Sequence, residues 1–247
     1  MGRAARVFSV SGVYHVVFRG VNQQSIFEEE EDYNKLIEDI EKVKNDMHFS
    51  IYAYCFMSNH VHMVVKENKD LEISVIMKRI LTRYARWYNI KYGRSVALIA
   101  NRYKSIPFEI DDYFLHLIRY VHQNPLKACL VEKLEDYKFS SYQEYTGESR
   151  LIDRELVDSL IDREGFIEYH RESEEMIFNV TDSMRKSDDE LKLYLIKKFG
   201  ITNPKDISKF EKERKIEILK ELRNKYSDRQ IQRVTDVPRG FVAKIEP

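Results

Sequence analysis

Apolar and polar residues follow two repeating patterns along the first half of the chain. Alternation with a period of two is typical of half-buried strands, and apolar residues three or four positions apart are typical of helices. In chain order we expect a strand at Val13–Phe18, a helix at Glu31–Asp46, strands at Ser50–Phe56 and His60–Val65, a helix at Leu71–Tyr92, and a strand within Ser95–Ile99 or Ile106–Ile110. This β-α-β-β-α-β order predicts an α+β fold with a ferredoxin-like or RRM-like antiparallel sheet and helices on one face.

The second half of the chain has a helical pattern. A helix through Ile118 and Val121 should end at Pro125, because proline cannot continue a helix. Ile207 to Tyr226 is amphipathic, and two short helices follow it around a turn at Thr235 to Val237, which is a helix-turn-helix layout. We therefore predict an α+β domain at residues 1–147, a helical connector at 148–185, and a helical C-terminal domain with the helix-turn-helix at 186–247.

The composition indicates a globular protein. Of the 247 residues, 43% are hydrophobic, which is enough for a core. The two cysteines, Cys55 and Cys129, suggest neither a disulfide framework nor a Cys-x-x-Cys pair, so we expect a reducing cytoplasm. The sequence has no apolar stretch of membrane-spanning length and, with only eight glycines, no phosphate-cradling glycine loop. We therefore expect neither a membrane partner nor a nucleotide cofactor.

The charges are segregated although the net charge is zero. Glu28 to Asp46 has nine acidic and three basic residues, whereas Lys78 to Lys104 has eight basic residues and no acidic one. Aromatic side chains lie among these bases, and such a mixture can neutralise phosphates and stack on nucleobases. The same block also fits an amphipathic helix with a solvated charged face. Lys205 to Lys244 has twelve bases and seven acids, which suits phosphate contact by the helix-turn-helix.

Two histidines begin the second strand of the predicted hairpin, at His60 and His62. Alternate side chains of a strand share a face, so this pair can hold a divalent metal, although two ligands are too few. Further along, Tyr120 and Asn124 are four residues apart on a predicted helix and so share a face. They offer a phenol nucleophile beside an amide oxygen that can complete a metal site.

Other histidines and tyrosines have weaker claims to a site. His116 lies one helical turn before Tyr120 and is a candidate auxiliary residue. We interpret three further histidines as packing or surface residues, or as lying off the Tyr120 face: His15, His48 and His122. Two tyrosines are rival nucleophiles without ligand-like neighbours: Tyr142 and Tyr145.

The order and spacing of these motifs resemble a known family. The resemblance is carried by Met57-Ser58-Asn59-His60-Val61-His62, by Arg102-Tyr103-Lys104-Ser105, and by Arg119 to Ala128. Over roughly residues 10–146 the chain resembles the single-tyrosine HUH transposases, and more narrowly the REP-associated tyrosine transposases. The C-terminal helices are similar to the DNA-binding domain attached to some of these enzymes, with a shorter last helix.

The resemblance implies the HUH nuclease fold, metal-dependent strand cleavage and rejoining in transposition, and a role for each motif. Tyr120 would be the nucleophile that forms a 5′-phosphotyrosine, and His60, His62 and Asn124 would ligate Mg²⁺ or Mn²⁺. The substrate would be hairpin-forming single-stranded DNA. The protein would work in the bacterial cytoplasm at the nucleoid, as a monomer or a homodimer.

We expect DNA contacts from bases of the two basic blocks: Arg79, Arg83, Arg86, Arg102, Lys104, Arg233, Arg239 and Lys244. Two other functions fit the pattern. A non-catalytic, sequence-specific DNA-binding regulator would use the helix-turn-helix and leave the histidine pair idle. An RNA-binding module would need exposed aromatics on its sheet, and Tyr52 and Tyr54 are the residues with suitable spacing.

Overall fold

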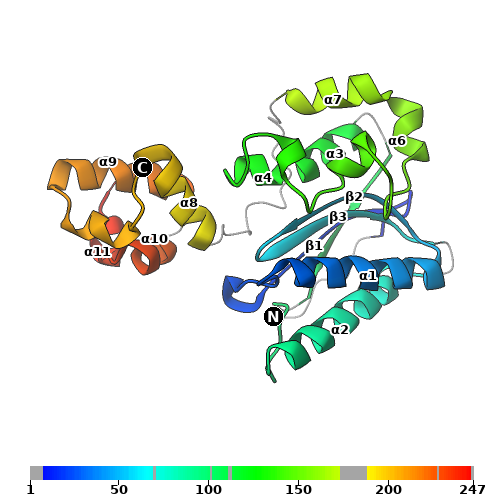
Figure 1. Cartoon of the computed structure of the whole chain (residues 1–247), viewed down its shortest axis with the longest axis horizontal. Coiled ribbons are helices and arrows are strands. Elements are labelled where there is room, and N and C mark those ends of the chain that lie inside the picture. Colours follow the sequence, from blue (N-terminus) through cyan, green and yellow to red (C-terminus); the bar gives the residue numbers. More distant parts are fainter. Residues whose placement is uncertain are drawn as a thin grey trace. The chain divides into compact units, whose positions relative to one another are not determined.

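A four-stranded antiparallel sheet forms the centre of the N-terminal part (Figure 1). The computed structural model describes residues 8–68, 71–100, 102–110, 113–172, 188–226 and 228–245. The strands, in the order β2-β3-β1-β4, are β1 (Val13–Arg19), β2 (Ser50–Met57), β3 (His60–Lys66) and β4 (Lys104–Phe108). With α1 (Glu30–Met47) and α2 (Ile73–Lys91) they follow in the predicted order β-α-β-β-α-β, and β4 overlaps the later of its two expected ranges.

Helices lie on both faces of this sheet. In Figure 1, α1 and α2 cover one face and α3 (Phe114–His122) lies on the other. The expectation of helices on one face therefore holds only for α1 and α2. The physical reason is the burial pattern, because β1 and β3 are buried at every position except the last and so have no solvent-facing side.

Parts of the segment after α3 pack along the edge of β2. It contains α4 (Asn124–Lys127), η2 (Leu134–Asp136), α5 (Tyr142–Thr146), α6 (Glu155–Leu160) and α7 (Arg163–Arg171). Ser141 donates its backbone N–H to the Tyr54 carbonyl at 3.0 Å, and Asp153 and Ile51 exchange bonds of 2.8 and 2.9 Å. Residues 148–172, which were expected to connect two domains, therefore belong to the unit of the sheet.

The C-terminal helices form a compact unit with its own core. They are α8 (Asp188–Phe199), η4 (Pro204–Lys209), α9 (Lys212–Arg223), α10 (Asp228–Thr235) and α11 (Arg239–Val242). Residues Leu126–Glu132 belong to this unit, whereas Lys133–Glu172 belong to the unit of the sheet. The single helix predicted from Ile207 to Tyr226 is wrong, because extended backbone at Phe210 and Glu211 separates η4 from α9.

Two sequence expectations concern absences. Cys55 and Cys129 are both free thiols. Among the described helices, none combines the length and apolar character that crossing a membrane requires.

Candidate active site

His60 and His62 lie side by side on the face of the sheet that α3 covers. His60 is opposite Arg19 of β1, and His62 is opposite Val17 of β1 and Cys55 of β2, so these side chains share one face. The two imidazole centroids are 5.1 Å apart, and both rings are buried. The spacing of two residues on a strand thus places His60 and His62 on one face of the sheet, as predicted from the sequence.

Tyr120 of α3 faces this histidine pair. Its ring centroid lies 5.9 Å from that of His62, with the ring planes 80° apart. The helix is held there by apolar side chains, since Leu117, Ile118 and Val121 are fully buried. Tyr120 itself is only 2% exposed. The fold therefore brings together a phenol and two imidazoles that are separated by almost sixty residues in the sequence.

His15, interpreted from the sequence as a packing or surface residue, belongs to the same cluster. Its Nε2 atom is 3.1 Å from Nδ1 of His62, and its ring centroid is 5.8 Å from that of Tyr120. Alternation along β1 places His15 on the face of Val17. Only the pairing of β1 with β3 brings it beside His62, and no signal in the sequence gives that register.

Burial keeps two imidazoles of this cluster, those of His15 and His60, neutral. It lowers the pKa of His15 to about 3. Burial, with a smaller effect from the positive charge of Arg19, lowers the pKa of His60 to about 4. Neutral imidazole is the form that ligates metal ions, so His60 is competent for ligation at neutral pH.

Asn124 stands at the start of α4, directly after α3. Its Nδ2 donates to the carbonyls of Tyr120 at 2.8 Å and Val121 at 3.2 Å. Because carbonyl oxygens only accept, the amide nitrogen faces the helix end and Oδ1 is turned away from it. That oxygen is the atom that a hard cation would use.

The donor set fits a divalent cation only when oxygen ligands complete it. Within the described ranges, no group of three or more His, Cys, Asp and Glu side chains is placed to hold a metal ion. Two imidazoles and an amide oxygen such as that of Asn124, together with water or a phosphate oxygen, would make a mixed set that Mn²⁺ or Mg²⁺ accepts.

The environment of Tyr120 makes deprotonation costly. Burial raises the pKa of the Tyr120 phenol above its usual value of about 10. Positive charge near the ring would oppose this effect. Arg19 lies on the same face, opposite His60, and its positive charge acts on that imidazole; no pattern in the sequence singles it out.

Three residues weighed beside Tyr120 have other contacts. His116 accepts a hydrogen bond at Nδ1 from Arg119 and packs on Tyr169 of α7, with centroids 5.6 Å apart. The Tyr142 hydroxyl lies 3.4 Å from Glu135 Oε1, and the Tyr145 hydroxyl donates to the Tyr52 carbonyl at 2.6 Å. Both phenols are thus tied into the packing of α5.

His122 points away from Tyr120, as the helix spacing indicated. Its Nε2 is 2.7 Å from the Ser141 hydroxyl and its Nδ1 is 2.9 Å from Nε2 of His170. His48, by contrast, is exposed and ends α1 in the left-handed conformation, at a φ of 51°. His122 and His48 therefore have the structural roles expected of them.

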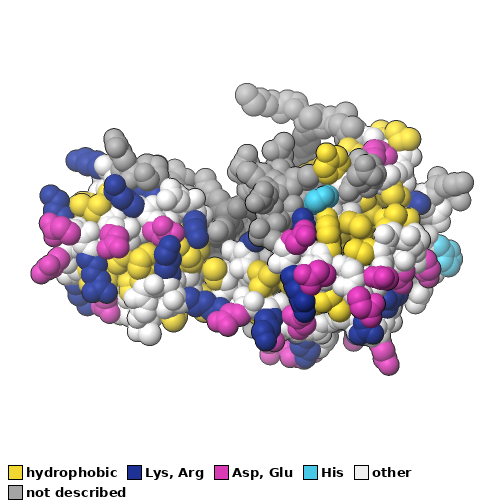
Figure 2. All heavy atoms as spheres, turned by 90° about the horizontal axis from the view of Figure 1, so that it is seen from above, with side chains coloured by type: hydrophobic (Ala, Val, Ile, Leu, Met, Phe, Trp, Pro, Cys, Tyr) yellow, Lys and Arg dark blue, Asp and Glu magenta, His cyan; other side chains and the backbone are white. Residues whose placement is uncertain are grey.

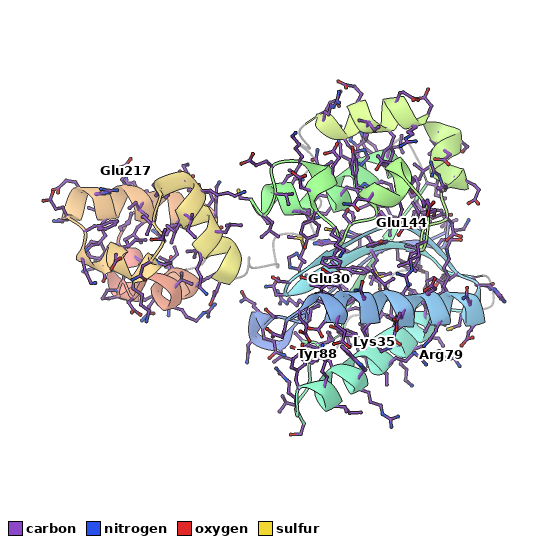
Figure 3. All side chains as sticks on the ribbon, in the orientation of Figure 1. Glu30, Lys35, Arg79, Tyr88, Glu144 and Glu217 are labelled. Carbon is purple, nitrogen blue, oxygen red and sulfur yellow. The ribbon has the colours of Figure 1, made fainter. Side chains whose placement is uncertain are left out.

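The basic residues of α2 have acidic partners on α1. Arg79 lies 3.5 Å from Asp46, and Arg83 lies 3.2 Å from Asp39, which also binds Lys35. Figure 3 labels Arg79 and Lys35 on this helical layer, across the sheet from α3. The acidic and basic blocks thus neutralise each other in part. The face drawn in Figure 2 is a different one, seen from above relative to Figure 1, and side chains of both charges are intermixed on it.

Other predicted DNA contacts have varied surroundings. Lys104 is exposed on β4 and opposite Val17, so it shares the face of the histidine pair. Arg86 and Arg102 are also exposed. In the C-terminal unit, Arg233 forms two bonds of 2.6 Å with Asp188, while two other bases at or after α11 are exposed: Arg239 and Lys244.

The family described as Transposase IS200 like matches residues 9–124. Over these residues the chain is similar to the IS200-like transposases. The matched stretch runs from before β1 to Asn124 and includes every residue of the cluster around Tyr120. The resemblance read from the sequence is thereby confirmed for this part of the chain.

A solved structure shows the same likeness at the level of the fold. A REP-associated tyrosine transposase bound to a REP hairpin superposes with a TM-score of 0.52 and 20% identity, over 62% of this chain and 89% of that chain. A candidate transposase from Deinococcus radiodurans R1 aligns with 14% identity over 50% of this chain and 97% of that chain, but its TM-score of 0.35 is too low to establish a shared fold. None of the curated proteins is similar enough in sequence to count as a match.

Proposed function

We propose that the protein cleaves and rejoins single-stranded DNA at hairpin-forming sites through a covalent 5′-phosphotyrosine at Tyr120. His60, His62 and Asn124 are the proposed ligands of Mg²⁺ or Mn²⁺. The observation that carries this proposal is the contact of the Tyr120 ring with the buried imidazoles of His62 and His15. It is supported by the similarity of residues 9–124 to IS200-like transposases and by the REP hairpin bound to the structural relative.

The proposed chemistry is one transesterification that can run in both directions. The Tyr120 oxygen loses its proton and forms a bond to phosphorus, while the bond from phosphorus to the 3′ oxygen breaks. The 3′ oxygen takes up a proton, so the products are a 5′-phosphotyrosine and a free 3′-hydroxyl. A bound divalent cation would polarise a non-bridging phosphate oxygen and favour the phenolate. The reverse attack by a 3′-hydroxyl joins a strand.

Binding of the DNA backbone is assigned to residues on the face of the histidine pair. Val17 of β1 is opposite His62 of β3 on one side and Lys104 of β4 on the other. Arg19 lies two residues after Val17 and therefore shares this face. Arg102 precedes β4 and extends this positive edge. These positions allow phosphate contact next to the site, which the α2 bases on the other face do not offer.

The C-terminal unit is proposed to bind DNA through α10 and α11 as a helix-turn-helix. The two helices are joined by a short turn with Asp236 in the left-handed conformation, at a φ of 58°. Arg239 and Lys244 are exposed at α11 and would contact phosphates. Because α11 has a single turn, base readout by this helix is limited.

The RNA-binding interpretation is wrong in its key requirement. An RRM-like module stacks bases on exposed aromatics of the sheet, but Tyr52 and Tyr54 are each only 5% exposed. Tyr52 packs on Phe114 of α3, and the Tyr54 hydroxyl donates to Glu144 at 2.6 Å. Both rings serve the interior of the protein.

The test is covalent capture of DNA. Wild type, Tyr120→Phe and the control Tyr142→Phe are incubated with hairpin-bearing single-stranded DNA and Mg²⁺, then separated on a denaturing gel. We expect an adduct with wild type and the control and none with Tyr120→Phe. An adduct formed by Tyr120→Phe would refute the nucleophile. If wild type binds the hairpin without any adduct, the protein is a non-catalytic regulator.

A further inference from the structure

Each histidine of the pair has a hydrogen-bonding partner at Nδ1. Asn59 Oδ1 is 2.6 Å from Nδ1 of His60, and His15 Nε2 is 3.1 Å from Nδ1 of His62. Both partners are enclosed, since Asn59 is 2% and His15 is 1% exposed. The Nδ1 atom of each imidazole is thus hydrogen-bonded to a buried side chain, and the two side chains come from different segments.

The orientation of Asn59 follows from its second contact. Its Nδ2 is 3.5 Å from the backbone carbonyl of Gln23, which can only accept, so the amide nitrogen faces Gln23 and Oδ1 faces His60. The loop after β1 also holds this turn through bonds from Gly20 to Asn59 at 2.9 Å and from Ile26 to Ser58 at 2.8 Å. Asn59 is therefore fixed from the backbone of another segment.

An amide oxygen cannot donate, so the proton between Asn59 and His60 belongs to Nδ1 of His60. A neutral imidazole carries a single N–H, and its other nitrogen then carries the lone pair. His60 is thereby set as the Nδ1–H tautomer, with the lone pair on Nε2. Metal-ligating histidines commonly have this arrangement, in which the non-ligating N–H donates to a fixed acceptor.

The pair of His62 and His15 allows two arrangements, and only one permits ligation. If His15 donates from Nε2, a neutral His62 carries its proton on Nε2 and has no lone pair there. If His62 donates from Nδ1, His15 accepts and the lone pair of His62 is on Nε2. The second arrangement makes His62 match His60.

We infer that Asn59 and His15 are positioning residues that hold His60 and His62 as Nδ1–H tautomers, so that both Nε2 lone pairs are available to a divalent cation. This inference rests on the proposed function, because it assigns the second layer of the same metal site. His15 and Asn59 are neither ligands nor nucleophiles in the proposed mechanism, and the inference gives both of them a role.

The tautomers can be measured without metal or DNA. The full chain, with ¹⁵N-labelled histidine, is examined by two-bond ¹H–¹⁵N correlation NMR, and the seven histidines are assigned by single substitutions. We expect the Nδ1–H form for His60, His62 and His15. An Nε2–H form of His60 or His62 in the wild type would overturn the inference.

Metal affinity provides the second readout. Asn59→Leu and His15→Phe remove the acceptors, and we expect each to weaken Mn²⁺ binding by about 10-fold to 100-fold in calorimetry. Asn59→Asp and His15→Gln keep an acceptor oxygen and should restore both the tautomer and the affinity. Unchanged Mn²⁺ affinity in both Asn59→Leu and His15→Phe would contradict the inference.

The matched control is His122→Phe. His122 is a fully buried histidine bonded to another histidine, His170, but it points away from Tyr120. The variant His122→Phe should leave Mn²⁺ affinity unchanged. If His122→Phe weakened Mn²⁺ binding as much as Asn59→Leu and His15→Phe, the loss would be a general effect of core damage and the assignment would be overturned. If tautomers and affinities behave as expected but wild type forms no DNA adduct, the proposed function alone fails.

Discussion

The position of α2 across the sheet from Tyr120 predicts which basic residues neutralise DNA phosphates. Lys104 is exposed on β4 and shares the face of the histidine pair, whereas Arg83 lies on α2 and pairs with Asp39. The informative perturbations are therefore Lys104→Gln and Arg83→Gln, which remove the same charge from opposite sides of the sheet. Both are made in the Tyr120→Phe background, so that no strand is cut during the measurement.

The expected magnitude follows from counterion release. Each phosphate contact on single-stranded DNA contributes about −0.7 to the slope of log affinity against log salt concentration, so slopes are compared by their magnitudes. Lys104→Gln should lower the slope by about 0.7, and the double change with Arg19→Gln by about 1.4. Arg83→Gln should leave the slope unchanged. Its effect on stability should be at most about 1 kcal/mol, because Arg83 is half exposed and Lys35 still binds Asp39 at 2.6 Å.

The assay is fluorescence anisotropy of a labelled hairpin-bearing single strand over a series of salt concentrations. Thermal unfolding of each variant checks that the fold is intact. The reasoning would be refuted if Arg83→Gln lowered the slope as much as Lys104→Gln, since the α2 layer would then lie on the DNA path.

Chelation, a buried carboxylate and a buried histidine provide three further tests. EDTA should abolish the DNA adduct and Mg²⁺ or Mn²⁺ should restore it; cleavage that survives EDTA would contradict the metal proposal. Glu144→Gln should lower the free energy of unfolding by about 2 kcal/mol in urea titrations, because Glu144 accepts bonds from the Tyr54 hydroxyl and from the Leu151 and Ile152 backbones, and no change would dispute this. Burial lowers the pKa of His170 to about 3, so the unfolded chain takes up the proton first as pH falls below about 6.5. The contribution of His170 to stability is then full above that pH and about 3 kcal/mol lower near pH 4. His170→Phe should remove this share of the acid-induced loss and leave the shares of His15 and His60.

The sequence alone determined the features that depend on local periodicity. The period of two in the hairpin places His60 and His62 on one face, and the helical period aims Tyr120 and the apolar side chains of α3 in one direction. These patterns hold whatever the rest of the chain does, because neighbouring residues of a strand or helix have fixed relative directions. The order of the elements along the chain, the hairpin and the shared face of its two histidines were therefore within reach of the sequence.

Only the tertiary structure decided which residues from distant segments meet. The β1–β3 register places His15 beside His62 and Arg19 opposite His60, and a shift by one residue would have turned both away. The packing of α1 against α2 pairs Arg83 with Asp39, so a basic block that suggested DNA contact is partly neutralised inside the fold. Such pairings depend on long-range contacts, whose register and partners are set by the burial of whole faces and leave no periodic signal in the chain.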